Sequence, residues 1–226
     1  GAIPIDTPNN INNINNIKWT GGDMYVVQVG DQIDRVRPSN WENNLCQSDD
    51  PELNQDEGSD LKIFSLFEIL NKQAIKEGGA VLGILGNHEL MNVLKQNFDY
   101  VTQKGMQMNY QNKNRTELVK PGGLLAKQLA CQAFGIIKIG DWVFVHAGLL
   151  SKHLRQYNEG FFEKINTLVK KILITGDLTD EDKQLLQGSE SIFWTRSFTN
   201  NPNACEDVNE TFNILKLNNG GIVVGH

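Results

Sequence analysis

The sequence contains few of the residues that cross-link secreted domains or bind nucleic acids. It has three cysteines among 226 residues, at long spacings, which excludes a disulfide scaffold and favours a reducing compartment. Acidic residues outnumber basic ones by 27 to 21, so a general surface for duplex nucleic acid is not expected. No apolar run approaches the roughly 20 residues that cross a bilayer. We therefore expect a cytoplasmic protein with neither nucleic acid nor membrane as a partner.

The rest of the composition is that of an ordinary globular domain. Hydrophobic residues make up 39% of the chain, and a chain of 226 residues can build one core without cross-links. The chain has no internal repeat and no evident linker, so we expect a single domain over residues 1–226. Within it, we expect residues 1–18 to form a polar leader without the features of a secretory signal, and residues 36–59 to form a long loop.

Short apolar runs alternate with helical patterns along the chain. Strands are predicted at 24–29, 80–85, 134–139, 142–146 and 221–225. Helices are predicted at 60–77, 121–133, 151–174, from 179 onward, with Thr179 as the N-cap, and at 208–217. Residues 102–120 are polar and are interpreted as a surface excursion. This alternation favours an α/β fold in which helices cover a mixed sheet.

Polar motifs follow four of the predicted strands. They are GDQIDR (30–35), GNHE (86–89), HAG (146–148) and GH (225–226). Ligands of α/β proteins bind beyond the carboxyl ends of the strands, so we expect these motifs at one edge of the fold. Three of the four histidines in the chain, His88, His146 and His226, occupy such positions. Because Asp, Asn and His are ligands that divalent metals accept, the pattern predicts a metal site.

The motif residues suit phosphoryl transfer between two cations. Two cations about 3.5–4 Å apart can activate water and hold the transferring phosphate. Asp31 is the candidate carboxylate that bridges both cations, and Asn87, His146 and His226 are the candidate ligands of one of them. Asn87 is also a candidate for contact with the phosphate.

The remaining motif residues suit the reaction itself. His88 is the candidate general acid, and Asp34 is expected to orient its imidazole. Arg35 and Arg196 are candidates to bind phosphate oxygens with their guanidinium groups, and Glu89 is expected to orient its loop rather than to bind metal. Taken alone, the GDxxDR motif fits a loop salt bridge equally well, and Arg196 could pair with an acidic neighbour.

Together and in this order, the motifs resemble those of the calcineurin-like metallophosphatases, in the phosphoprotein phosphatase branch. The longer stretches are similar to Shewanella-like phosphatases and to related proteins of large DNA viruses: WTGGDMYVVQVGDQIDR (19–35), GNHELMN (86–92), PGGLLAKQLA (121–130), IGDWVFVHAGL (139–149), IFWTR (192–196) and IVVGH (222–226). The resemblance spans residues 19–226 and implies a mixed β-sandwich flanked by helices. It also implies two divalent metal ions (Mn, Fe or Zn), a phosphorylated protein or peptide as substrate, and Arg196 as the second phosphate-binding arginine.

The chain departs from the family pattern at both ends. The D-x-H motif that supplies two further metal ligands in the family has no counterpart before Asp31, and the family pattern continues beyond the last GH. We therefore expect a fold without its first strand and C-terminal part, and a second metal position that retains only Asp31. Two alternatives stay open: a dinucleoside-polyphosphate hydrolase, and a pseudo-phosphatase module that binds phosphorylated partners without turnover.

Overall fold

The computed structural model describes residues 2–4, 16–34, 59–107, 110, 112–157 and 160–226. Its strands are β1 (Ala2–Pro4), β2 (Ile17–Trp19), β3 (Tyr25–Gln28), β4 (Ala80–Ile84), β5 (Ala133–Phe134), β6 (Ile136–Ile139), β7 (Trp142–Val145) and β8 (Gly221–Val223). Its helices are α1 (Ser59–Ala74), α2 (Asn87–Leu90), α3 (Gln103–Gln107), α4 (Arg115–Val119), α5 (Leu124–Gln132), α6 (Ser151–Tyr157), α7 (Phe161–Thr175), α8 (Asp180–Gln187), α9 (Ser197–Asn200) and α10 (Ala204–Leu215). A 3-10 helix, η5 (Ile75–Glu77), and a π-helix, η6 (Met91–Lys95), complete the described elements.

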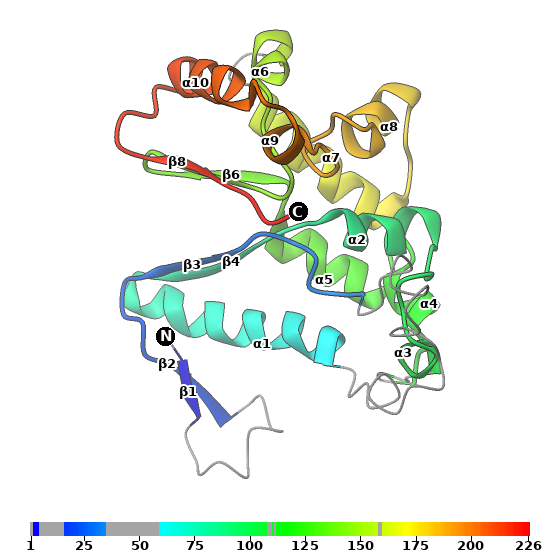
Figure 1. Ribbon diagram of the computed structural model, residues 1–226. Coiled ribbons are helices and arrows are strands. Elements are labelled where there is room, and N and C mark those ends of the chain that lie inside the picture. The colour runs from blue at the N-terminus through cyan, green and yellow to red at the C-terminus, as the bar shows by residue number, and fades with distance from the viewer. Residues whose placement is uncertain (1, 5–15, 35–58, 108–109, 111, 158–159) are drawn as a thin grey trace, which may run out of the picture.

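Two three-stranded sheets form the centre of the molecule. In the first sheet β4 lies between β3 and β5, and all three strands are parallel. In the second sheet β7 pairs antiparallel with β6 and parallel with β8. Helix α1 covers one face of the first sheet, and the second sheet lies above the other face of the first sheet. Helices α6 and α10 lie on the side of the second sheet that faces away from the first (Figure 1). The structure thus confirms a mixed α/β fold with helices around short sheets.

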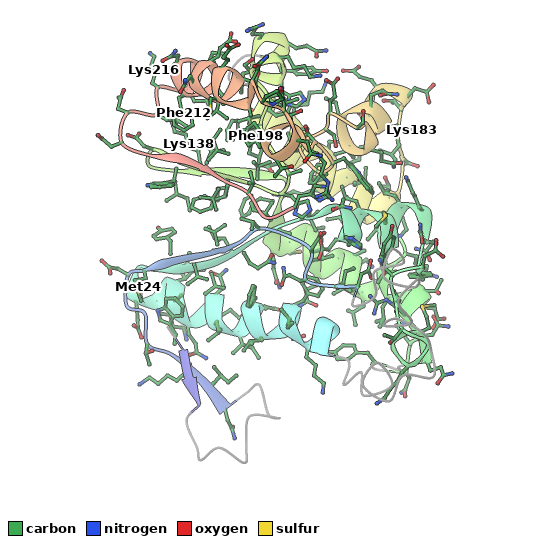
Figure 2. The ribbon with its side chains drawn as sticks, viewed as in Figure 1. Met24, Lys138, Lys183, Phe198, Phe212 and Lys216 are labelled. Atoms are coloured by element: carbon green, nitrogen blue, oxygen red, sulfur yellow. The ribbon has the colours of Figure 1, made fainter. Side chains whose placement is uncertain are left out.

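The main core lies between the second sheet and helices α5 and α7. Ile165, Val169 and Ile172 of α7 recur at helical spacing and are completely buried. They belong to one apolar cluster with Ile136 of β6 and with Phe193. Phe212 packs against this cluster from α10, on the side of that helix that faces the second sheet (Figure 2). This core anchors the ends of the strands at which the polar motifs lie.

The predicted strand over 134–139 is divided between the two sheets. Ala133–Phe134 pairs with β4, whereas Ile136–Ile139 pairs with β7. The chain changes sheets at Gly135, where the side-chain oxygen of Asn166 on α7 accepts hydrogen bonds from the amides of Gly135 and Ile136, at 2.8 and 3.2 Å. The side-chain amide of Asn166 donates to the Ile136 carbonyl at 2.9 Å. A side chain therefore replaces the strand partner that this bend lacks.

The expected polar leader includes residues that belong to the fold. Ile17–Trp19 pairs antiparallel with Ala2–Pro4, and Trp19 is buried in a small cluster beside α1. The side chain of Gln73 on α1 accepts a hydrogen bond from the Trp19 amide at 2.8 Å and donates to the Ile17 carbonyl at 3.0 Å. A strand of three residues within an Asn-rich segment has no periodicity that sequence patterns can detect.

Two further predictions need correction, and one is confirmed. Residues 102–120 are not simply a surface excursion, because α4 turns Leu118 and Val119 into the core. The predicted helix over 151–174 is divided into α6 and α7. Thr179 caps α8 as predicted, and its hydroxyl accepts a hydrogen bond from the Asp182 amide at 3.1 Å.

The predicted loop over 36–59 lies almost entirely outside the described residues. None of the helices in the described part of the chain has both the length and the apolarity to span a membrane.

One histidine of the fold, His153 on α6, is buried away from the strand-end motifs. Its ring stacks on Phe161 with 5.3 Å between the ring centres. Burial, followed by the positive charge of Lys152, lowers the pKa of His153 to about 4. Because an unfolded histidine titrates near 6.5, the unfolded chain binds more protons than the folded one between these two values. Stability contributed by neutral His153 is therefore present above pH 6.5 and is lost as the pH falls toward 4.

We predict that His153→Leu flattens the pH dependence of stability in this window. The wild-type free energy of unfolding should fall by about 3 kcal/mol more than that of the variant between pH 6.5 and pH 4, since each unit of pKa shift is worth about 1.4 kcal/mol. Urea unfolding of both proteins at several pH values measures the difference. Identical slopes would show that His153 is not buried in its neutral form.

Candidate functional site

The loop that follows β3 is held in shape by the carboxylate of Glu89. One oxygen of Glu89 accepts hydrogen bonds from the amides of Asp31 and Gly86, at 3.0 and 2.7 Å, and the other accepts from the Gln32 amide at 2.7 Å. In the same loop the backbone is left-handed at Asp31 (φ 55°) and at Asp34 (φ 71°). Asp adopts this conformation more readily than most residues. The prediction that Glu89 orients its loop is confirmed.

Burial and the nearby charge of Asp31 both act on Glu89. Burial raises the pKa of the Glu89 carboxyl, and repulsion by the charge of Asp31 raises it further. The three amide hydrogen bonds oppose this shift because they stabilise the ionised form. Glu89 therefore sits in a place where its charge is costly, and the backbone amides of two loops offset that cost.

The loops after β3 and β4 pass close together because two glycines lie at the crossing. A Cβ on Gly30 would lie 2.6 Å from the Cα of Gly86 and 2.6 Å from Nδ1 of His146. Gly30 also has a φ of 97°, which side chains other than hydrogen rarely permit. These glycines allow the polar ends of β3, β4 and β7 to converge.

The convergence produces a cluster of four potential metal ligands around His146. Its Nε2 lies 2.9 Å from Oδ1 of Asn87, 3.1 Å from Nδ1 of His226 and 3.4 Å from Oδ2 of Asp31. Ligand atoms of Asp31, His146 and His226 all lie within 4.8 Å of one another. The amides of Gly225 and His226 donate to the His146 carbonyl at 2.8 and 3.0 Å, which fastens the end of β8 to the end of β7.

The tautomer of His146 follows from its second nitrogen. Nδ1 lies 2.7 Å from the Val29 carbonyl oxygen, which only accepts, so Nδ1 carries a proton and donates it. Nε2 of the neutral ring then directs a lone pair toward the oxygens of Asp31 and Asn87. Lone pairs that face one another repel unless a cation or a second proton on the ring lies between them. One carboxylate, one amide oxygen and two imidazoles form a donor set that fits a divalent transition metal.

The charges within the cluster shift all of its titrating groups. Burial alone would raise the pKa of Asp31, but the hydrogen bond and positive charge of His146 hold it below its usual value. Burial would likewise lower the pKa of His146, whereas Asp31 raises it. Burial, then repulsion by His146 and Arg196, lowers the pKa of His226 to about 4. His226 is therefore neutral at pH 7 and keeps a lone pair available for a cation.

The side chains of His88 and Asp34 form a hydrogen-bonded pair beside this cluster. Nδ1 of His88 is 2.8 Å from Oδ2 of Asp34, and both side chains are buried. Since a carboxylate accepts, Nδ1 of His88 donates in this contact. The opposite nitrogen, Nε2, faces the cluster at 4.0 Å from Oδ2 of Asp31. The ring of Tyr100 contacts His88 edge-on with 4.7 Å between ring centres. One nitrogen of His88 is thus held, and the other is turned toward the candidate ligands.

The structure brings together the residues singled out at the strand ends: Asp31, Asp34, Asn87, His88, His146 and His226. Arg196 is exposed at the start of α9, and its charge reaches His226. Arg35 lies outside the described residues. Two polar residues to which the sequence analysis gave no role, Asn92 in the GNHELMN stretch and Arg115, contact Asp34. Arg115 stands alone in a polar segment, and only its burial in the structure distinguishes it.

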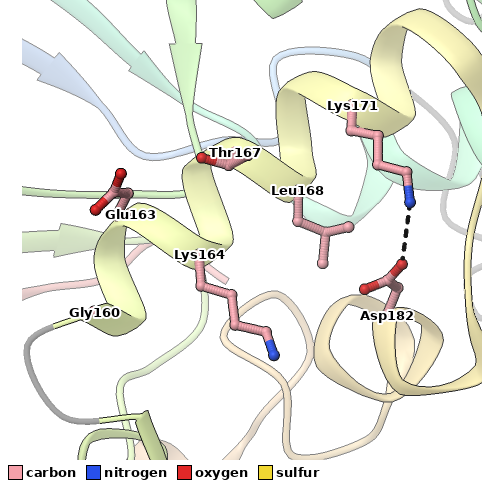
Figure 3. Close-up of a pocket in the computed structure, with 7 residues that line it drawn as sticks. All are labelled: Gly160, Glu163, Lys164, Thr167, Leu168, Lys171 and Asp182. Atoms are coloured by element: carbon pink, nitrogen blue, oxygen red, sulfur yellow. Dashed lines mark hydrogen bonds and ion pairs between the residues drawn. The ribbon is translucent and has the colours of Figure 1, made fainter.

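A surface pocket of about 430 Å³ between α7 and α8 involves none of these residues (Figure 3). Its two lysines are each matched by a carboxylate, because Lys171 lies 3.5 Å from Asp182 and Lys164 lies 2.7 Å from Glu181. The pocket therefore offers little unbalanced positive charge to an anion. The strand ends remain the candidate site.

Known proteins resemble this chain in sequence and in fold, although no family model matches it. The uncharacterized protein R398 of Acanthamoeba polyphaga mimivirus is 33% identical over 193 residues, which cover 71% of this chain and 74% of that protein. Shewanella-like protein phosphatase 2 of Arabidopsis thaliana is 27% identical over 224 residues and is matched over 51% of its length. The chain thus spans about half the length of that phosphatase.

A solved structure has the same fold. The cold-active protein-tyrosine phosphatase of a psychrophilic Shewanella species matches with a TM-score of 0.65 at 22% identity. The match covers 92% of this chain and 56% of that one. The fold, the strand-end motifs and the viral and plant relatives agree, and the chain belongs to the metallophosphatase family that includes the Shewanella-like protein phosphatases.

Proposed function

We propose that this chain carries the catalytic centre of a metal-dependent phosphomonoester hydrolase that acts on phosphorylated proteins. The observation that carries the proposal is the convergence of the ligand atoms of Asp31, Asn87, His146 and His226 beside the His88–Asp34 pair. A set of ligands next to an oriented imidazole is what hydrolysis of a phosphate ester requires.

The four ligand candidates would hold one divalent cation, and Asp31 would share a second. When bound, such cations act as Lewis acids that polarise a phosphoryl oxygen and activate water. Asp31 suits a shared role because one of its oxygens faces His146 and the other accepts a hydrogen bond from the His88 amide at 3.1 Å. The His88 amide thereby holds the carboxylate in one orientation. The contact of His146 with Val29 does the same for the imidazole.

The chain's other residues would bind the phosphate and transfer the proton. His88 donates the proton on Nε2 to the leaving oxygen while Nδ1 stays hydrogen-bonded to Asp34. Arg196, and Arg35 beyond the described residues, would bind phosphate oxygens with paired N–H groups, and the Asn87 amide would add a further contact. The role of His88 rests on its Nε2, which faces the ligand cluster, and the roles of the two arginines rest on the motifs that contain them.

The substrate class and the finer fold follow from the family. Relatives named as protein phosphatases support a phosphorylated protein as substrate, in preference to a dinucleoside polyphosphate. We further propose that the two stacked sheets form the mixed β-sandwich of the family within a single domain. The ligands suit Mn, Fe or Zn, all of which accept imidazole together with carboxylate.

Side-by-side assays of the chain test the proposed function. With Mn²⁺ added, the protein should hydrolyse phosphopeptides faster than diadenosine tetraphosphate, and a chelator should abolish the activity. Inorganic phosphate released from each substrate is the measurement. Equal activity with and without chelator, or a preference for diadenosine tetraphosphate, would contradict the proposal. Binding of phosphopeptide without turnover at any metal concentration would support a pseudo-phosphatase instead.

Asp31→Asn should weaken metal binding more than Asn87→Ala or His226→Ala. Asp31 supplies the only negative charge among the four ligand candidates, and the amide of Asn cannot replace it. We expect the Mn²⁺ affinity to fall by more than about 100-fold, which is the upper end of what loss of an outer-shell partner costs. Titration calorimetry measures the Mn²⁺ affinity of each variant. His153→Leu, which removes a histidine outside the cluster, is the control and should keep the wild-type affinity. Near-normal affinity in Asp31→Asn would rule out its role as a ligand.

His88→Asn should lower turnover while it leaves Mn²⁺ affinity nearly unchanged. Loss of a general acid typically costs about 10²–10⁴-fold. The loss should be largest for phenyl phosphate and smallest for p-nitrophenyl phosphate, because nitrophenolate leaves without help from an acid. Steady-state kinetics on both esters provide the measurement. A loss of metal binding in this variant would reassign His88 as a ligand.

A further inference from the structure

The carboxylate of Asp34 is completely buried and is contacted by more than His88. Its Oδ2 accepts from Nδ1 of His88 at 2.8 Å and from the side-chain amide of Asn92 at 2.9 Å. Its Oδ1 accepts from the same amide at 3.1 Å and from Nη2 of Arg115 at 3.3 Å. Both oxygens are therefore held by neighbours, which restricts rotation of the carboxylate.

Arg115 and Asn92 also bind each other. Nε of Arg115 donates to the side-chain oxygen of Asn92 at 3.3 Å, and the amide of Asn92 donates to the His88 carbonyl at 3.1 Å. The orientation of the Asn92 amide is set by this chemistry, because its oxygen meets a donor and its nitrogen meets acceptors. Only 1% of the Arg115 side chain is exposed, so its charge is compensated inside the protein.

Two local features bring these residues to Asp34. Asn92 lies in the π-helix η6. There the backbone N–H of Gln96 donates a hydrogen bond to the carbonyl of Met91, five residues earlier. Single π-turns occur often at functional sites because they re-aim side chains. Arg115 begins α4, whose start is capped by Asn114 through a hydrogen bond from the Glu117 amide at 2.9 Å. The cap fixes the backbone from which the guanidinium reaches inward.

We propose that Arg115, together with Asn92, is a positioning residue for the reaction proposed above. The two side chains hold Asp34 so that its Oδ2 keeps Nδ1 of His88 in place. Nε2 of His88 is thereby kept pointing at the ligand cluster. Arg115 contacts Asp34 and Asn92, and we place its effect on His88 through Asp34. The inference rests on the proposed function for its kinetic consequence, but the geometry of the His88–Asp34 pair can be tested separately.

The kinetic test combines Arg115→Met and His88→Asn in a double-mutant cycle. Arg115→Met should lower kcat on phenyl phosphate by about 10- to 100-fold, which is less than removal of the acid itself, with little change in KM. In the His88→Asn background the same change should cost less than about 3-fold, because the group that it positions is gone. Arg155→Met is the matched control, since Arg155 pairs with Glu210 at the exposed surface. It should leave kcat unchanged.

A second readout does not depend on turnover. The proton on Nδ1 of His88, hydrogen-bonded to buried Asp34, should give a downfield resonance in the NMR spectrum of the metal-free protein. We expect this resonance to shift or disappear in Arg115→Met and Asn92→Ala and to stay in place in Arg155→Met. Arg115→Lys keeps the charge but loses the forked geometry, so it should restore part of both the signal and kcat.

These results separate the inference from the proposed function. If the wild-type chain hydrolyses no phosphate ester, the proposed function fails, while the NMR comparison still decides whether Arg115 holds the pair. Additive losses in the cycle, or an unchanged His88 resonance in Arg115→Met, would overturn the positioning role. If Arg115→Met does not fold, Arg115→Lys and Asn92→Ala go through the same cycle and the same NMR comparison, and the same outcomes decide.

Discussion

The geometry of the candidate site depends on one buried carboxylate, that of Glu89. It accepts hydrogen bonds from the backbone amides of Asp31, Gln32 and Gly86. These bonds connect the loop after β3 to the loop after β4. The crossing is possible because Gly30 and Gly86 leave room for each other. The connection holds the backbone of Asp31, whose side chain faces His146 at 3.4 Å. Burial of a charge is costly, so the three amides that offset it are also what joins the two loops.

Most of the candidate site could be predicted from the sequence because its residues follow apolar strands directly. Asp31, Asn87 and His146 each lie within a few residues of a strand end, where the chain has little freedom to move them apart. Glu89 could be given its role because it lies in the same short motif. Periodicity and strand-end position thus carried this part of the prediction.

The rest depends on contacts between distant segments, which no local pattern encodes. Arg115 reaches Asp34 across 81 residues, and a lone arginine in a polar stretch has no distinguishing periodicity. The division of the strand at Gly135 depends on the side chain of Asn166, 31 residues away. The very short strand that carries Trp19 is hydrogen-bonded to α1 through the side chain of Gln73. In each case the contact comes from a side chain on a distant segment of the chain.

The contact between His146 and His226 joins positions 80 residues apart. A cation held between them would close a loop that contains helices α6 to α10, and closing a loop of that length removes much conformational entropy from the unfolded chain. Free energy of metal binding would then also be free energy of folding for this part of the molecule. The metal would act as a reversible cross-link in a protein whose described cysteines, Cys131 and Cys205, are both free.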